Sequence, residues 1–147
     1  MKTQFSIQSA LVAGLAATAA MTAFTFMAPL MGFEMNIPQM LAGTMGAPII
    51  VGWLVHFMVG LVLAILYAAV VLPGLNKEAN LKSGALFGIA PWLLAQLMVM
   101  PMMGLMSGGN FVSGLFSGSV LIAMASLIGH LLYGTVLGFL YNPHTGK

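Results

Sequence analysis

Cysteine, arginine and charge in general are what this sequence lacks. The 147 residues contain no cysteine, which excludes disulfides, thiolate metal sites and cysteine nucleophiles. The net charge of +2 comes from four lysines and two glutamates, too few for a nucleic-acid-binding surface. A chain that is 61% hydrophobic and 4% charged cannot cover a water-exposed surface with polar side chains. We therefore expect an integral membrane protein whose first partner is the lipid bilayer.

Long apolar stretches are what the sequence has instead. A membrane-spanning helix takes about 20 residues, and four stretches are long enough. Each should be helical, because lipid cannot satisfy open backbone hydrogen-bonding groups. The sequence predicts an all-α membrane protein, with residues 1–147 forming one domain that is a four-transmembrane-helix bundle. The expected spans cover residues of about 5–31, 49–72, 82–106 and 118–141.

The lysines indicate the orientation of the spans. Lys2 precedes the first span, Lys77 and Lys82 lie between the second and third, and Lys147 follows the fourth, so all four share one side. The positive-inside rule then places both termini in the cytoplasm. The first 20 residues also resemble a secretory signal peptide. Hydrophobicity continues beyond them through MTAFTFMAPLM, which favours a membrane span.

Two connecting segments carry structural signals. EMNIPQMLAG (34–43) predicts a short interfacial helix with Asn36 as N-cap, Pro38 in its first turn and Gly43 as its stop. SGGNFVSGLFSG (107–118), rich in glycine and serine, predicts a loop on the outer membrane surface. Gly114 and Gly118 in that loop are also suited to a homodimer contact.

The chain contains an internal repeat. HFMVGLVLAILY (56–67) and HLLYGTVLGFLY (130–141) share a histidine, a glycine four residues later and a final tyrosine. We expect two parallel helical-hairpin repeats, over about residues 5–72 and 82–141, related by a pseudo-twofold axis along the membrane normal. Tyr67 and Tyr141 should lie at the cytoplasmic interface, where tyrosines anchor membrane helices.

The repeat places His56 and His130 at equal depth within the membrane, with Gly60 and Gly134 on the same helix faces. Gln96 lies at a similar depth by residue count. The commonest interpretation is structural. Small residues let membrane helices approach closely, and the histidines hydrogen-bond across helices. The candidate partners are Gln96, Thr22, Thr25 and Ser126.

Two ligand-binding interpretations stay open beside it. In the first, His56 and His130 on diagonally placed helices ligate one haem b iron, and Gly60 and Gly134 leave room for the macrocycle. In the second, copper(I) or another soft cation binds to methionine thioethers and the histidines. Methionines recur at helical spacing in the outer half, as Met27, Met31 and Met35 and as Met98, Met102 and Met106, and the candidate ligands among them are Met27, Met31, Met98 and Met102. Methionine is also a common apolar filler, so the cofactor stays unassigned.

Enzymatic chemistry has little support in the sequence. Glu34 and Glu78 fall on opposite sides of the membrane, so they cannot form a pair of acid–base carboxylates. No carboxylate lies near either intramembrane histidine to complete a triad. We expect a non-enzymatic membrane protein that supports a larger assembly, binds other subunits or a second copy of itself, or holds a ligand between its helices.

Four segments together resemble a known family: NIPQMLAG, GWLVHFMVG, PWLLAQLMVMPMMG and GHLLYGTVLGFLY. They are similar to an uncharacterised family of small four-span bacterial inner-membrane proteins, catalogued as a domain of unknown function. The resemblance covers nearly the whole chain. It implies a multi-pass protein of the bacterial inner membrane and a four-helix fold. It implies no activity and no functional residues.

Overall fold

A computed structural model describes residues 5–143, and every regular element in that range is helical. Four helical runs within it are long and apolar enough to cross a membrane, as the sequence predicted. Lys2, Lys147 and His144 lie outside the described residues. The observed runs begin and end within a few residues of the expected ones. They are Ile7–Met31, Ile49–Gly74, Leu81–Met106 and Val120–Leu140.

Three of the four spans change helical type along their length. The first consists of α1 (Ile7–Thr25) and, after a short turn, the 3₁₀ helix η1 (Ala28–Met31). The second consists of α3 (Ile49–Leu66), the π-helical η2 (Tyr67–Val71) and α4 (Leu72–Gly74). The third consists of α5 (Leu81–Leu94), the π-helical η3 (Ala95–Val99) and α6 (Met100–Met106). The fourth is α8 (Val120–Leu140) alone.

Proline explains the two π-helical segments. η2 ends two residues before Pro73, and η3 ends two residues before Pro101. Proline donates no backbone hydrogen bond and its ring crowds the carbonyl four residues earlier. A one-turn widening of the helix accommodates that defect without ending the span. Each hairpin therefore contains one π-helical segment. It lies in the second span for the first hairpin and in the third span for the second hairpin.

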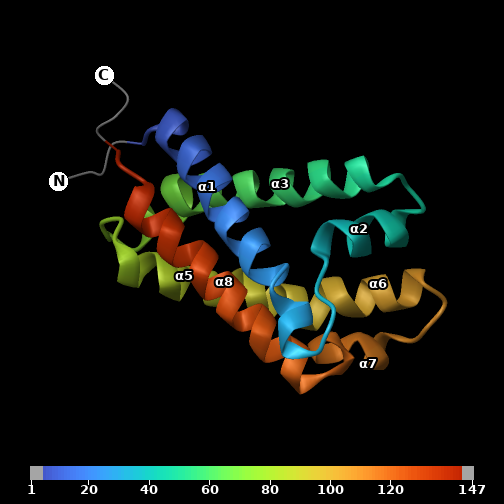
Figure 1. Ribbon diagram of the computed structural model, residues 1–147. Coiled ribbons are helices and arrows are strands. Elements are labelled where there is room, and N and C mark those ends of the chain that lie inside the picture. Colours follow the sequence, from blue (N-terminus) through green and yellow to red (C-terminus); the bar gives the residue numbers. More distant parts are fainter. Residues whose placement is uncertain (1–4, 144–147) are drawn as a thin grey trace.

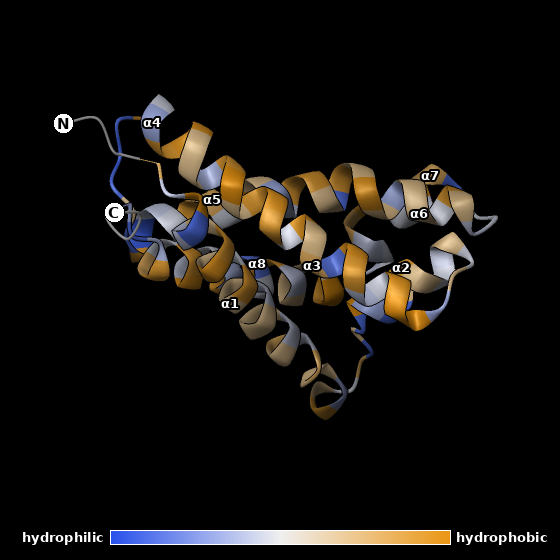
Figure 2. Cartoon of the chain, turned by 90° about the horizontal axis from the view of Figure 1, so that it is seen from above, coloured by the Kyte–Doolittle hydropathy of each residue, from blue (hydrophilic) through white to orange (hydrophobic). Residues whose placement is uncertain are grey.

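The spans pack as two hairpins, α1 against α3 and α5 against α8 (Figure 1). α1 also packs along α8, more extensively than along α3, and so joins the hairpins, whereas no comparable packing joins α3 to α5 within residues 5–143. The pseudo-twofold symmetry that the repeat predicted is therefore incomplete. Figure 2 shows hydrophobic residues along all of the long helices. In the second and third spans, much of this apolar surface faces outward.

Two short elements cover the end of the bundle that lies away from the α4–α5 turn, which we call the α2–α7 end (Figure 1). α2 (Ile37–Met45) is the predicted interfacial helix, and the Asn36 side chain accepts a hydrogen bond from Gln39 N at 3.0 Å. The predicted stop at Gly43 was wrong. The helix continues to Gly46, which ends it with φ +61° in the left-handed conformation that glycine favours.

The segment predicted as a loop, residues 107–118, is partly helical. It forms α7 (Phe111–Gly114), capped by the Asn110 side chain, and the 3₁₀ turn η4 (Leu115–Gly118). A Cβ on Gly114 would lie 2.6 Å from Pro101 Cα and 2.7 Å from Met100 O. Gly114 thus makes a close contact with α6 of the same chain.

Candidate functional site: the histidine core

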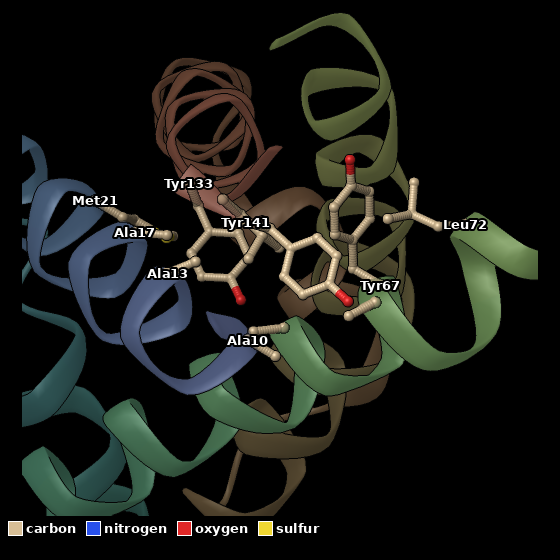
Figure 3. Close-up of a cluster of buried hydrophobic side chains, with 11 residues drawn as sticks. Ala10, Ala13, Ala17, Met21, Tyr67, Leu72, Tyr133 and Tyr141 are labelled. Carbon is tan, nitrogen blue, oxygen red and sulfur yellow. The ribbon is translucent and has the colours of Figure 1, made fainter. Parts of the chain in front are cut away.

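Three tyrosines fill the middle of the bundle toward the α4–α5 end (Figure 3). Tyr133 of α8 is 2% exposed, and its hydroxyl donates a 2.5 Å hydrogen bond to Gly60 O of α3. Tyr67 and Tyr141, which we expected as interface anchors, are instead buried, at 0% and 4% exposed. Their rings meet edge to face at 6.4 Å. The space between the second and fourth spans is therefore occupied by side chains of the protein itself.

His56 links the second span to the first. Its Nε2 lies 2.8 Å from Thr22 Oγ1, and the Thr22 hydroxyl lies 2.7 Å from Thr18 O. A hydroxyl has one proton. When Thr22 donates that proton to Thr18 O, its oxygen accepts a hydrogen bond from the Nε2–H of His56. This is one of the histidine contacts that the sequence predicted, and it joins α3 to α1 through buried polar atoms.

His130 is held within its own helix. Its Nδ1 lies 2.8 Å from Ser126 O. A carbonyl oxygen only accepts hydrogen bonds, so Nδ1 carries the proton and Nε2 has the lone pair when the ring is neutral. Ser126 Oγ, 3.4 Å from the same nitrogen, accepts a hydrogen bond from Gln96 Nε2 at 3.2 Å. Of the predicted partners, Ser126 therefore contacts His130 directly, and Gln96 contacts it through Ser126.

The contacts around His130 continue beyond α8. Gln96 Oε1 accepts a 2.8 Å hydrogen bond from Ser117 Oγ in η4. No buried side-chain nitrogen or oxygen within residues 5–143 lacks a hydrogen-bond partner. We call this set of linked side chains the histidine core. It consists of Thr22, His56, Gln96, Ser117, Ser126 and His130.

Gly60 and Gly134 have their neighbours in the adjacent spans. A Cβ on Gly60 would overlap the Thr18 hydroxyl of α1, and one on Gly134 would overlap the carbonyl of Gly84 in α5. The equivalent glycines of the repeat thus let each hairpin close on itself. Helices α1 and α5 occupy the space that the haem interpretation reserved beside each imidazole.

The four methionines that the sequence singled out lie on the outside of the chain. Met27, Met31, Met98 and Met102 are 55%, 54%, 58% and 51% exposed. Residues 5–143 also contain no cluster of three or more histidine, aspartate or glutamate side chains that could hold a metal ion. The side chains of the histidine core are held by interhelical and intrahelical hydrogen bonds.

Sequence reasoning missed Tyr133, whose hydroxyl contacts Gly60 O, and Ser117 of the histidine core. Tyr133 lies one helical turn from His130, so helical spacing could have placed it on the same face. Ser117 offered no such signal, because its contact with Gln96 depends on how η4 folds back over the third span.

The fold and the site together define a polytopic helical protein of the membrane type, with a hydrogen-bonded polar core between its spans. The chain belongs to the Family of unknown function (DUF6789), whose model matches residues 5–147. This finding confirms the resemblance to an uncharacterised family that the sequence indicated. Comparison with curated proteins and with solved structures found no match.

Proposed function

We propose that this protein is a non-enzymatic accessory subunit of the bacterial inner membrane, and that its histidines fix the packing of the four spans. The observation that carries the proposal is the closed centre of the bundle. Tyr133 crosses from the fourth span to the second, and its hydroxyl contacts Gly60 O. A protein that acts by supporting others needs a rigid interior and an apolar exterior, and both features are present.

The outer surface supports a role in a larger assembly. Side chains on α8 such as Val120 and Phe139 are 77% and 69% exposed, whereas Leu137 of the same helix is fully buried. Such surface faces lipid or another membrane protein. A photo-crosslinking residue placed at Val120 or Phe139 in native membranes should give one discrete protein adduct that mass spectrometry identifies. The adduct is a partner subunit or a second copy of this chain.

Leu137 provides the matched control, because a crosslinker there points into the bundle and should give no intermolecular adduct. Absence of any discrete protein adduct at the exposed positions, with the protein present and folded, would contradict the proposal. It would leave a protein surrounded by lipid alone.

A haem b between His56 and His130 is the alternative function. In its favour, the repeat puts the two histidines at equivalent positions of the second and fourth spans. His130 Nε2 is also the ring nitrogen without the proton in the neutral form. An absorption spectrum of the purified protein, as isolated and after dithionite, distinguishes the two functions. A Soret band that shifts on reduction and is lost in His56→Ala and His130→Ala would favour haem. A featureless spectrum with haem supplied supports the packing role.

The proposed orientation places the α4–α5 turn in the cytoplasm. Lys77 and Lys82 lie at that turn, and positive charge is retained on the cytoplasmic side. The natural absence of cysteine makes a direct test simple. A membrane-impermeant maleimide should label Ser107→Cys in intact spheroplasts and should label Asn76→Cys only after permeabilisation. The reverse pattern would invert the topology.

A further inference from the structure

A second feature of the molecule lies at the α2–α7 end, and neither imidazole lines it. It is a pocket of about 230 Å³ that is open to the surface, called the cavity below. It lies between α2 on one side and α6, α7 and η4 on the other. Thioether and hydroxyl side chains dominate its lining, and no charged side chain contributes. The side chains that carry the argument are Met40, Met100, Met103, Thr44, Ser113 and Ser117.

Three methionines converge on this cavity from two elements. Met100 and Met103 are three residues apart on α6 and so lie on one helix face. Met40 reaches the cavity from α2. Met103 is 9% exposed, in contrast to Met98 and Met102 of the same span, which are more than half exposed. The third span thus carries three outward-facing methionines, Met98, Met102 and Met106, and two others that line a site.

The lining selects a class of ligand. Thioether sulfur is a soft ligand that suits Cu(I), whereas Mg²⁺ and Ca²⁺ need carboxylate and carbonyl oxygens. Without a charged side chain in its lining, the cavity would leave a divalent ion with an uncompensated double charge. We propose that Met40, Met100 and Met103 bind one soft monovalent cation, Cu(I) or its analogue Ag(I), in this cavity. The proposal concerns binding alone and involves no change of oxidation state.

Backbone strain beside the cavity provides a second, independent observation. Phe116 and Ser117 adopt φ values of 50° and 57°, the left-handed region that non-glycine residues rarely occupy. The hydrogen bond from Ser117 Oγ to Gln96 Oε1 holds this turn in place. Strained residues persist where the surrounding structure enforces them, and they cluster at ligand sites. Ser117 itself lines the cavity.

The π-helical segment η3 contributes to the same site. It contains Gln96 and ends at Val99, immediately before Met100. Widened helical turns of this kind occur frequently at functional sites, because they rotate the residues that follow. Gly114 then brings α7 against the Met100 backbone and closes the cavity wall. The strained turn at Phe116 and Ser117, the π-helical segment η3 and the close contact of Gly114 with α6 thus all lie beside the same group of methionines.

The first test uses the full chain, purified in mild detergent and kept anaerobic. Cu(I) is titrated in competition with bicinchoninate, a coloured Cu(I) chelator. We expect one Cu(I) per chain. Loss of an outer-shell partner alone weakens metal affinity about 10- to 100-fold, so Met40→Leu with Met103→Leu should lose at least as much. Met98→Leu with Met102→Leu is the matched control and should bind Cu(I) as the wild type does.

A second measurement requires no variant and so does not depend on mutant folding. Wild-type protein is treated with a limiting amount of hydrogen peroxide with and without Ag(I), and methionine oxidation is located by peptide mass spectrometry. Ag(I) should protect Met40, Met100 and Met103 and leave Met98 and Met102 unprotected. No stoichiometric Cu(I) binding, equal loss in both double variants, or protection of the exposed methionines instead would each overturn the proposal.

Discussion

A single methyl group on α8 provides the most direct test of the packing. Gly134→Ala adds a Cβ that would overlap the Gly84 carbonyl and lie 2.9 Å from Gly84 C and 3.1 Å from Gly88 N. All three contacts are with backbone, so no side chain can rotate away. Helices α5 and α8 must separate instead. Overpacking of a well-packed interior costs about 1–3 kcal/mol, and the rigid contacts here favour the upper half of that range.

Gly129→Ala on the same helix is the matched control. The nearest atoms to its Cβ belong to the Met21 and Phe24 side chains, at 3.6 Å and beyond, which is ordinary van der Waals contact. Alanine is favoured over glycine inside a helix by about 0.5–1 kcal/mol. We therefore expect Gly129→Ala to be neutral or slightly stabilising and Gly134→Ala to destabilise by about 2 kcal/mol net.

The assay is unfolding by sodium dodecyl sulfate in mixed micelles with dodecyl maltoside, followed by tryptophan fluorescence and circular dichroism. Trp53 and Trp92 provide the fluorescence signal. A net change of about 2 kcal/mol corresponds to roughly a thirtyfold change in the unfolding equilibrium constant. Equal free energies of unfolding for the two variants would refute the close approach of α5 and α8.

Three further predictions concern the hydrogen bonds of the bundle. Tyr133→Phe removes only the donor to Gly60 O and should cost about 0.5–1.5 kcal/mol in the same assay. Thr22→Val removes the partner of His56, and membrane hydrogen bonds of this kind average about 0.6 kcal/mol, so a smaller loss is expected. Gln96→Leu removes the hydrogen bond that holds the turn at Ser117. Amide hydrogen exchange over η4 should then be faster than in the wild type. Unchanged unfolding for the first two, or unchanged exchange for the third, would contradict them.

Much of the site could be anticipated from residue spacing. The repeat places a glycine four residues after each histidine, and helical periodicity alone assigns the two to one face. Thr22 and Ser126 were recognisable as partners, because they are among the few polar side chains within apolar spans. A buried polar group needs a partner, so few candidates restrict the choice.

The use of the glycines could not be read from the same spacing. A glycine on a helix face provides space either for a ligand or for another helix. The residue spacing is the same in both cases, so the sequence does not distinguish them. At Gly60 the neighbour is Thr18, and at Gly134 it is Gly84. Those neighbours are fixed by how the hairpins close. The burial of Tyr67 and Tyr141 was missed for the same reason. A tyrosine near the end of a span has the same sequence context whether it lies at the membrane interface or is buried between helices.

The sequence by itself determined the class of protein and the number of spans. Composition and the length of apolar runs control partitioning into lipid, and neither depends on which helix packs against which. Only the tertiary structure decided which methionines gather around a cavity and which face outward. Met100 and Met102 differ by two residues, yet one lines the cavity and the other is 51% exposed. Helical spacing alone puts Met100 and Met102 on opposite faces of α6. That the face of Met100 is the one that lines the cavity follows from its packing against α2 and α7, which depends on the packed bundle.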